Sequence, residues 1–484
     1  MALERELVMR VVPVSVPGVD WAVAQRVDEG RFRPRHAQTA CQRWFRIVRS
    51  ILIAALGTWS TAAAAADNCH LGAYRLRDGR TIDIAPSEGQ TLRWRAFDGE
   101  TGALTRQSDG SWRSSLGWTG RPDGRRITFS SCRIGKISFA GVTGKRLPLE
   151  VTDTSFLSHG VKLVGRLVLP PGRARVPIVI LIHGAEHDSA LDSYPLQRLF
   201  PAGGIGAFVY DKRGTGASGG HYTQDYPTLA ADADAALEEA RRLAGARAGR
   251  IGYQGGSQGG WVAPLATKTA PADFVIVSFG LAVSPIAEER ESIEHDIRSQ
   301  VSGPDGVKIA DQFAAAIERV ADSNFREGFD QLDAIRKRYG REAWFKRVGG
   351  EFARFLLDTT DDTVRMEGPP LVAGINLNYD PMPVLRSLNV PQLWLLGGED
   401  RDAAPYETVR RLTRLRCAGR PITLAVYPKA EHGLYEFEIS PTGERLSTRQ
   451  PQSYFRLMRD FILKGRVPRH EANDANFPSC HSPA

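Results

Sequence analysis

One serine stands between glycines in the segment Gly255-Gly256-Ser257-Gln258-Gly259. A strand-like run, 250–254, precedes it and an apolar run, 261–265, follows it, so the sequence predicts a strand, a sharp turn and a helix start. A serine on such a turn has a strained backbone that only glycine neighbours tolerate, and its hydroxyl stands clear of the sheet at the N-terminus of the next helix. The pentapeptide alone is common by chance in a glycine-rich chain. Its surroundings must therefore support the prediction that Ser257 is a nucleophile.

A serine nucleophile needs a base that takes its proton and an acid that orients the base. The buried apolar run 390–396 ends in Gly397-Gly398-Glu399-Asp400-Arg401-Asp402, and His432 follows a second buried run, 421–427. Both groups are expected just past the carboxyl ends of parallel strands, where open α/β sheets place their sites. The order serine, aspartate, histidine predicts a triad of Ser257, Asp400 and His432.

A further buried run, 178–182, leads into His183-Gly184-Ala185-Glu186. A loop there can aim a backbone N–H at the developing oxyanion, together with the N–H of the residue after the nucleophile. We therefore expect an oxyanion hole formed by Ala185 and Gln258. His183 is expected to hold this loop through hydrogen bonds and to take no part in the chemistry.

The run 207–210 continues into a glycine-punctuated turn, Asp211-Lys212-Arg213-Gly214-Thr215-Gly216-Ala217-Ser218. We expect Asp211 and Arg213 to secure this turn through charge-assisted hydrogen bonds. The alternative is that Arg213 lies near the mouth of the site and binds an anionic substrate.

These ordered motifs make the chain from about Gly160 to about Leu463 resemble the α/β-hydrolase family. The resemblance is strongest to the serine aminopeptidase and bacterial esterase branches, which insert helices between the sixth and seventh strands. It implies an α/β fold with a mostly parallel sheet and a helical cap. The acid turn departs from the family pattern, in which the aspartate usually stands four residues before a proline. Here Asp400 stands five residues before Pro405 and Asp402 three, so either could orient His432, and the Gly-x-x-Asp spacing favours Asp400.

The first 66 residues differ from the remainder. Arginines 43, 46 and 49 precede the short apolar run 51–56 and a series of alanines that ends at Ala66. This pattern is typical of a Sec-type signal peptide cleaved near Ala66, and it predicts export to the periplasm or the medium. The segment before it, from Met1 to about Arg43, is interpreted as a mis-assigned start. The alternative is an anchor helix, although the apolar run is too short to span a membrane comfortably.

Net charge and cysteine content limit the partners and the compartment that the sequence predicts. The net charge is +8, but residues 1–66 hold nine arginines against five acids, so half of the excess lies in the leader. No basic stripe with interleaved aromatic residues occurs, so we expect no nucleic-acid binding. Leader removal leaves four of the five cysteines, an even number that favours disulfides in an exported chain. The favoured pair is Cys69 with Cys132, which bracket one small domain, and Cys417 with Cys480 would then join the C-terminal tail, but the sequence leaves the pairing open.

The mature chain divides into four parts. Residues 67–148 carry four Asp-Gly turn signals (Asp78-Gly79, Asp98-Gly99, Asp109-Gly110 and Asp123-Gly124), which predict a small β-rich domain whose tryptophans form its core or, alternatively, a sugar- or lipid-binding face. Residues 149–284 and 382–484, the latter with a C-terminal tail, are expected to form the hydrolase core. Residues 285–381 switch to helical periodicity and are expected to form the cap.

Three functions remain open. The first is an exported serine hydrolase that cleaves carboxylic esters through an acyl-enzyme, and the second is a serine aminopeptidase with the same triad. The third is a non-catalytic binding protein on a hydrolase scaffold. An aminopeptidase needs carboxylates for the substrate ammonium group, and one cap segment could supply Glu288, Glu289, Glu291, Glu294 and Asp296, although such a cluster is more often a solvated helix face. We expect a small ester or short peptide as substrate, no cofactor and no metal site, since no phosphate loop, dinucleotide fingerprint or Cys-x-x-Cys motif occurs. The oligomeric state is not predicted.

Overall fold

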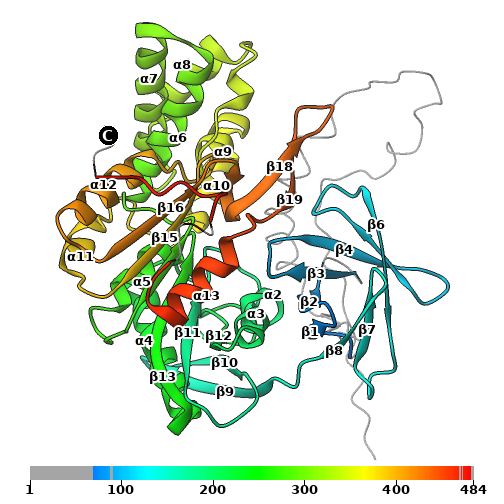
Figure 1. Ribbon diagram of the computed structural model, residues 1–484. Helices are drawn as coiled ribbons and strands as arrows, with labels where there is room; N and C mark the ends of the chain where they lie inside the picture. Colours follow the sequence, from blue (N-terminus) through cyan, green and yellow to red (C-terminus); the bar gives the residue numbers. More distant parts are fainter. Residues whose placement is uncertain (1–68, 88–90, 468–469, 471, 481–484) are drawn as a thin grey trace, which may run out of the picture. The chain divides into compact units, whose positions relative to one another are not determined.

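The computed structural model describes residues 69–87, 91–467, 470 and 472–480. Its N-terminal part is a closed antiparallel barrel in which each strand pairs with the next and the last pairs with the first (Figure 1). The strands are β1 (Gly72–Leu76), β2 (Thr81–Pro86), β3 (Leu92–Ala96), β4 (Thr101–Arg106), β5 (Trp112–Ser115), β6 (Pro122–Phe129), β7 (Lys136–Phe139) and β8 (Val142–Arg146). The expected β-rich domain is thus confirmed, and closure of the barrel leaves it no sheet edge.

Apolar side chains fill the barrel. Trp94 and Phe139 meet edge to face with ring centroids 4.8 Å apart, and Trp112 is also buried, so these rings belong to the core. Three of the four Asp-Gly signals lie in tight connections between strands. Asp123-Gly124 instead lies inside β6, so that expectation was wrong. The pairing of β5 with β6 is irregular there, and the Asp123 carboxylate accepts hydrogen bonds from Ser114 and Arg125.

A mixed eight-stranded sheet follows, in the order β16-β15-β14-β13-β11-β12-β10-β9. All neighbours from β12 to β16 are parallel, and β9 and β10 form an antiparallel pair at one end. The strands are β9 (Glu150–Ser158), β10 (Val161–Leu169), β11 (Val176–Ile182), β12 (Gly206–Tyr210), β13 (Ala248–Gly256), β14 (Val275–Ser278), β15 (Gln392–Gly397) and β16 (Ile422–Tyr427). The expected α/β class with a mostly parallel sheet is confirmed.

Both faces of this sheet are buried, which explains the near-continuous apolar runs. Ile178, Ile180 and Ile182 of β11 face one hydrophobic cluster, and Val179 and Leu181 face the other. The first cluster includes residues of α4 (Tyr226–Ala244), α5 (Gly259–Ala266), α11 (Met382–Ser387) and α12 (Tyr406–Cys417). The second includes residues of α2 (Ala190–Ser193), α3 (Leu196–Ala202) and α13 (Tyr454–Lys464).

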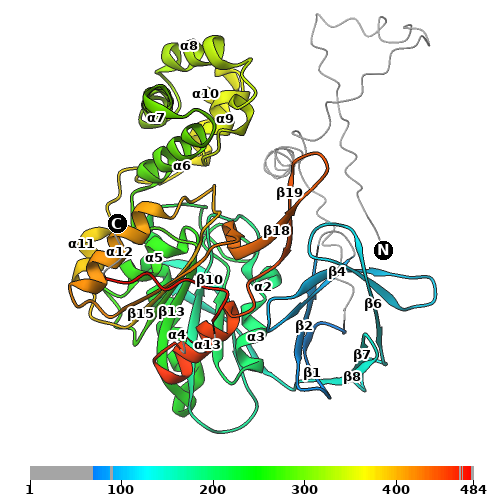
Figure 2. The same cartoon turned by 45° about the horizontal axis from the view of Figure 1, so that its top comes forward.

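The segment from Pro285 to Leu371, between β14 and α11, is helical, as the change of periodicity predicts, and its helices lie together in both views (Figures 1 and 2). They are α6 (Pro285–Gln300), α7 (Gly303–Asp322), α8 (Phe329–Tyr339), α9 (Ala353–Asp358) and α10 (Asp361–Leu371). Ser284 caps α6, and its hydroxyl accepts a hydrogen bond from the backbone N–H of Ala287. We refer to these helices as the cap.

A small sheet that the sequence did not reveal follows His432. It consists of β17 (Ala430–Glu431), β18 (Tyr435–Ile439) and β19 (Arg445–Arg449). Tyr435 packs edge to face against Trp118 of the barrel, with ring centroids 4.6 Å apart, and the Trp118 N–H donates to the Ser447 carbonyl at 2.8 Å. A second link joins Asp83 of β2 to Arg198 of α3, at 2.6 Å. The barrel therefore packs directly on the sheet-containing part.

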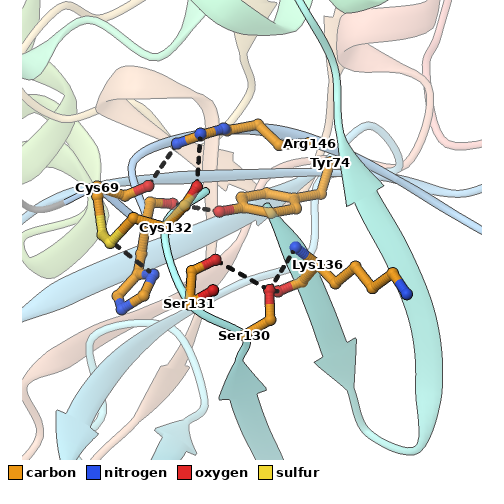
Figure 3. The surroundings of a disulfide bond; sticks show 8 residues. Cys69, Tyr74, Ser130, Ser131, Cys132, Lys136 and Arg146 are labelled. Carbon is orange, nitrogen blue, oxygen red and sulfur yellow. Dashed lines mark hydrogen bonds between the residues drawn. A yellow bond between two sulfur atoms is a disulfide. The ribbon is translucent and has the colours of Figure 1, made fainter. Parts of the chain in front are cut away.

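Both expected disulfides, Cys69–Cys132 and Cys417–Cys480, occur in the structure (Figure 3 shows the first). Among the described residues, no helix has the length and apolarity that a bilayer crossing requires. The predicted signal peptide and its cleavage position lie outside the described residues.

Candidate functional site

Ser257 occupies the turn between β13 and α5 with a positive φ of 50°, a conformation that costs a non-glycine residue energy. The two flanking glycines permit this turn. A Cβ on Gly255 would collide with the carbonyl of Gly259, and a Cβ on Gly259 would lie 2.7 Å from the carbonyl oxygen of Ile182. The local sequence therefore folds into the sharp strand-to-helix turn that its glycines predict.

The structure brings the three predicted triad residues together. Oγ of Ser257 lies 3.2 Å from Nε2 of His432, and Nδ1 of His432 lies 2.9 Å from Oδ2 of Asp400. The other carboxylate oxygen of Asp400 accepts hydrogen bonds from the backbone N–H groups of Asp402 and Ala403, at 3.1 and 2.8 Å. This fixes the carboxylate toward the imidazole. Asp402, the alternative acid, does not make the contact to His432.

Electrostatics around His432 favour the imidazolium ion. Burial of the ring lowers its pKa, but the charge of Asp400 and the hydrogen bond to it, together with the charges of Asp402 and Glu288, raise it more. The net pKa of His432 is therefore above its ordinary value. Phe279, whose own φ is positive at 43°, packs edge to face on the ring at 5.1 Å and limits its movement.

The two residues predicted to form an oxyanion hole belong to segments that meet at Ser257. Gln258 is the residue at the start of α5, so its N–H belongs to the helix N-terminus. On the other side, a Cβ on Gly184 would lie only 3.3 Å from Cβ of Ser257. The loop is fixed at the next residue, because the Tyr222 hydroxyl donates to the Ala185 carbonyl at 2.7 Å.

Lys212 and Glu186 also shape this loop, and sequence reasoning missed both roles. Nζ of Lys212 donates to the Gly184 carbonyl at 2.8 Å, and burial lowers the pKa of Lys212 to about 8. Its backbone N–H donates to Nε2 of His183 at 3.1 Å, so His183 holds the loop in the way expected. A Cβ on Gly184 would lie 2.9 Å from Oε2 of Glu186 and 3.3 Å from Cβ of Ser257, which places that carboxylate near Ser257.

The turn 211–218 is secured as expected. Asp211 accepts hydrogen bonds from the Ser189 hydroxyl and from the backbone N–H of Ala217, at 2.8 and 3.0 Å. Arg213 forms a two-pronged pair with Asp232 of α4, whose carboxylate is fully buried. Its guanidinium is therefore engaged in the fold.

The acids of α6 are not a solvated helix face, so that expectation was wrong. Glu289 and Asp296 are buried at 1% and 6% exposure, and each accepts hydrogen bonds from groups outside its own helix. Glu289 accepts from the backbone N–H groups of Phe352 and Ala353, and Asp296 accepts from Gly349 and pairs with Arg401. Glu291 accepts from the Glu407 N–H, and Glu294 pairs with Arg290 at 3.5 Å.

Glu288 differs from these acids because its charge raises the pKa of His432. Burial and the charge of Glu351 raise its pKa well above the ordinary value, while the charge of His432 opposes this shift. Glu351, from the loop before α9, also interacts electrostatically with His432 and with Tyr222. Two carboxylates of the cap thus lie within electrostatic range of the His432 imidazole. The sequence pointed to Glu288, but nothing in it distinguished Glu351.

One group within the described part of the chain has the ligand types and spacing of a metal site, namely Cys69, His70 and Cys132. Both of its sulfur atoms are in a disulfide, which removes the thiolates that a metal would bind. The site around Ser257 contains no such group among the described residues.

The fold and the site together define the class of protein: the chain is a hydrolase of the α/β-hydrolase type. A family model described as X-Pro dipeptidyl-peptidase (S15 family) matches residues 159–338, from β10 to α8. This stretch holds the loop after β11, the turn with Ser257 and the first half of the cap. No curated protein matches the chain.

Solved structures with a similar fold include esterases and peptidases. An esterase from Pyrococcus furiosus is 16% identical over 59% of this chain and 84% of its own, with a TM-score of 0.38. An acylaminoacyl peptidase from Pyrococcus horikoshii is 15% identical over 82% of this chain and 55% of its own, with a TM-score of 0.40. The proline iminopeptidase of Mycobacterium smegmatis is 16% identical over 65% of this chain and 98% of its own, with a TM-score of 0.39.

Proposed function

We propose that this chain is an exported serine hydrolase that cleaves carboxylic esters, with Ser257 as nucleophile, His432 as base and Asp400 as the acid that orients it. The observation that carries the proposal is the continuous line of contacts from Oγ of Ser257 through both ring nitrogens of His432 to Asp400. A carboxylate at Nδ1 holds the imidazole in the tautomer whose Nε2 accepts the serine proton.

The reaction proceeds through an acyl-enzyme. Oγ of Ser257 attacks the ester carbonyl carbon while its proton moves to Nε2 of His432, and the carbonyl oxygen becomes an anion. The backbone N–H groups of Ala185 and Gln258 stabilise that anion. The intermediate collapses when His432 gives the proton to the departing alcohol. Water then attacks the acyl group, loses a proton to His432, and releases the acid and free Ser257.

Esters are the favoured substrates because four of the five α6 acids are engaged in the fold and are not available to a substrate ammonium group. The acyl-enzyme route places no further demand on an ester, whose alkoxide leaves more readily than an amide nitrogen. Export is supported by two disulfides, which persist in oxidising compartments.

One observation favours a second function, that of an aminopeptidase. Glu288 and Glu351 bring two carboxylates near His432 without a cationic partner in any described contact, and a substrate ammonium group would supply one. This would agree with the peptidase family whose model matches residues 159–338.

Two measurements test the proposal. Ser257→Ala is expected to abolish fluorophosphonate labelling and to lower turnover by about 10⁶-fold, whereas Ser299→Ala, a change at an exposed cap serine, leaves both unchanged. Labelling of the Ser257→Ala variant by the fluorophosphonate would contradict the assignment of Ser257 as the nucleophile. Short p-nitrophenyl esters are expected to turn over much faster than aminoacyl p-nitroanilides.

The aminopeptidase alternative requires the reverse substrate order. It also requires that Glu288→Gln or Glu351→Gln abolish amide turnover while Glu294→Gln, the matched change at an engaged acid, does not. For the ester hydrolase, Glu351→Gln is expected to leave the maximal rate on esters nearly unchanged.

A further inference from the structure

The described residues of the barrel include none of the three residues of the triad, and its interior is filled by side chains. Its inward side chains form one hydrophobic cluster, with Ile82, Ile84, Trp94, Leu104 and Phe139 all fully buried. An eight-stranded barrel is just wide enough for side chains to fill it. Any partner of the barrel must therefore contact its outer surface.

Four strands of that surface carry an array of cations. The outward positions of β5 to β8 include Arg113, Arg126, Lys136 and Lys145, and all four side chains are exposed. Strand register places them in two pairs, because Arg113 lies opposite Arg126 and Lys136 lies opposite Lys145. The pairs stand toward opposite ends of β6 and β7, since Arg126 is beside Ala140 and Lys136 is beside Ser130. We call these four residues the basic face.

The arrangement is unfavourable for the folded barrel. Like charges directly opposite each other on neighbouring strands are destabilising. The acid within these four strands is Asp123, whose carboxylate is 5% exposed and paired with Arg125. Arg126 has one exposed partner, Asp109 in the turn between β4 and β5, at 2.9 Å. Selection for stability would place acids opposite these cations, so the retained charge indicates an anionic partner.

An aliphatic side chain lies next to the Lys136–Lys145 pair of the basic face. The loop between β6 and β7 contains Cys132, exposed Arg133 and Ile134, and the Ile134 side chain is 56% exposed. The disulfide to Cys69 and hydrogen bonds between Ser130 and Lys136 hold this loop in place. Figure 3 shows the Lys136 side chain extending away from the disulfide.

We propose that the basic face and Ile134 bind the surface of an anionic phospholipid bilayer. Cations attract the headgroups, and one exposed aliphatic side chain at a rigid loop can enter the boundary of the acyl chains. Polysaccharides and single-stranded nucleic acids are usually held on aromatic rings. In the described part of the barrel, Ile134 is the exposed large hydrophobic residue, and Trp94 and Trp112 are inside. The proposal does not depend on the substrate of the catalytic site.

Vesicle sedimentation with the full chain tests the inference. Binding is expected to vesicles of phosphatidylcholine with one third phosphatidylglycerol, to be weak on phosphatidylcholine alone, and to fall with added salt. Each removed cation is expected to weaken binding about fivefold, equivalent to about 1 kcal/mol, so Lys136→Gln with Lys145→Gln loses about 25-fold. Ile134→Ser is expected to weaken binding to vesicles further.

The matched control is Lys337→Gln with Lys346→Gln, which removes the same charge from exposed cap positions and is expected to leave binding unchanged. Equal losses in both double variants, or no loss in either, would overturn the proposal. Binding to an anionic polysaccharide such as heparin that depends on Lys136 and Lys145 but not on Ile134, without binding to vesicles, would assign the face to a polymer instead. Turnover of soluble esters is expected to be the same in all variants.

Discussion

Asp400 and Asp402 are both candidates in the sequence for the acid that orients His432. In the structure, only Asp400 makes the hydrogen bond to the imidazole. Proline spacing leaves Asp400 and Asp402 equivalent, because it gives no direction for either side chain. The direction follows from the turn, in which the N–H groups of Asp402 and Ala403 both point at the Asp400 carboxylate. Asp402 then contributes only its charge, which raises the pKa of His432.

Substitution of Asp400 and substitution of Asp402 should therefore have different effects on turnover. Asp400→Asn is expected to lower turnover by about 10⁴-fold at all pH values, since an amide at Nδ1 favours the wrong tautomer. Asp402→Asn should keep the maximal rate. The base must be neutral, so kcat/KM falls as pH drops through the pKa of His432, and removal of a negative charge lowers that pKa. The acid limb of the profile is thus expected to move to lower pH. A pH profile of kcat/KM for both variants distinguishes the two acids. Loss of rate at all pH values in Asp402→Asn alone would identify Asp402 as the acid that orients His432.

Residue types and chain order were enough to expect Ser257, His432 and the loop at Gly184 close together, because strand ends and glycine turns fix their positions locally. Glu186 and Glu351 could not be found in this way. Their proximity to the nucleophile and the base depends on loops that fold back over the site, and no periodicity records the path of a loop.

At the scale of elements, the buried strands and the amphipathic helices were the predictable parts. The run 161–169 predicts a strand with the bounds of β10, and the helical periodicity after Pro285 predicts the cap. The sheet of β17 to β19 was missed because its half-buried strands alternate charged and apolar residues without a buried face. Glu289 and Asp296 of α6 were misjudged because their backbone partners lie more than fifty residues away, at 349–353.

Glu289 is expected to be the acid that holds the cap together. Glu289→Ala leaves the N–H groups of Phe352 and Ala353 buried without an acceptor, which is expected to cost about 2 to 5 kcal/mol of unfolding free energy. Glu294→Ala breaks only a partly exposed pair with Arg290 and should cost less than about 1 kcal/mol. Denaturant unfolding of both variants provides the comparison, and equal costs would contradict the structural role of Glu289.

At the scale of the whole molecule, charges that sequence reasoning assigns to solvent are buried where the barrel meets the hydrolase part. Asp83 and Arg93 occupy outward positions of barrel strands, and alternation alone predicts that they face water. Both are buried, at 0% and 5% exposure, and Asp83 pairs with Arg198 of α3. Alternation distinguishes the two faces of a strand, but it does not say what covers the outer face.

This packing makes Asp83 a test of how the two parts depend on each other. Asp83→Ala leaves Arg198 largely buried without its partner, and breaking a buried pair in this way is expected to cost about 3 to 5 kcal/mol. Asp153→Ala removes the partner of Arg166 in a more exposed pair and should cost less than about 1 kcal/mol. Thermal unfolding monitored by tryptophan fluorescence compares them. A loss for Asp83→Ala no larger than that for Asp153→Ala would show that the two parts are stable independently.

The pair between Arg401 and Asp296 joins helix α6 to the turn that carries Asp400. The turn at 400–402 thus both anchors α6 through Arg401 and carries Asp400, the proposed acid of the triad. A displacement of α6 would pull on Arg401, the residue next to Asp400, and would weaken the hydrogen bond between Asp400 and His432. The position of the cap and the alignment of Asp400 with His432 are therefore expected to depend on the same ion pair.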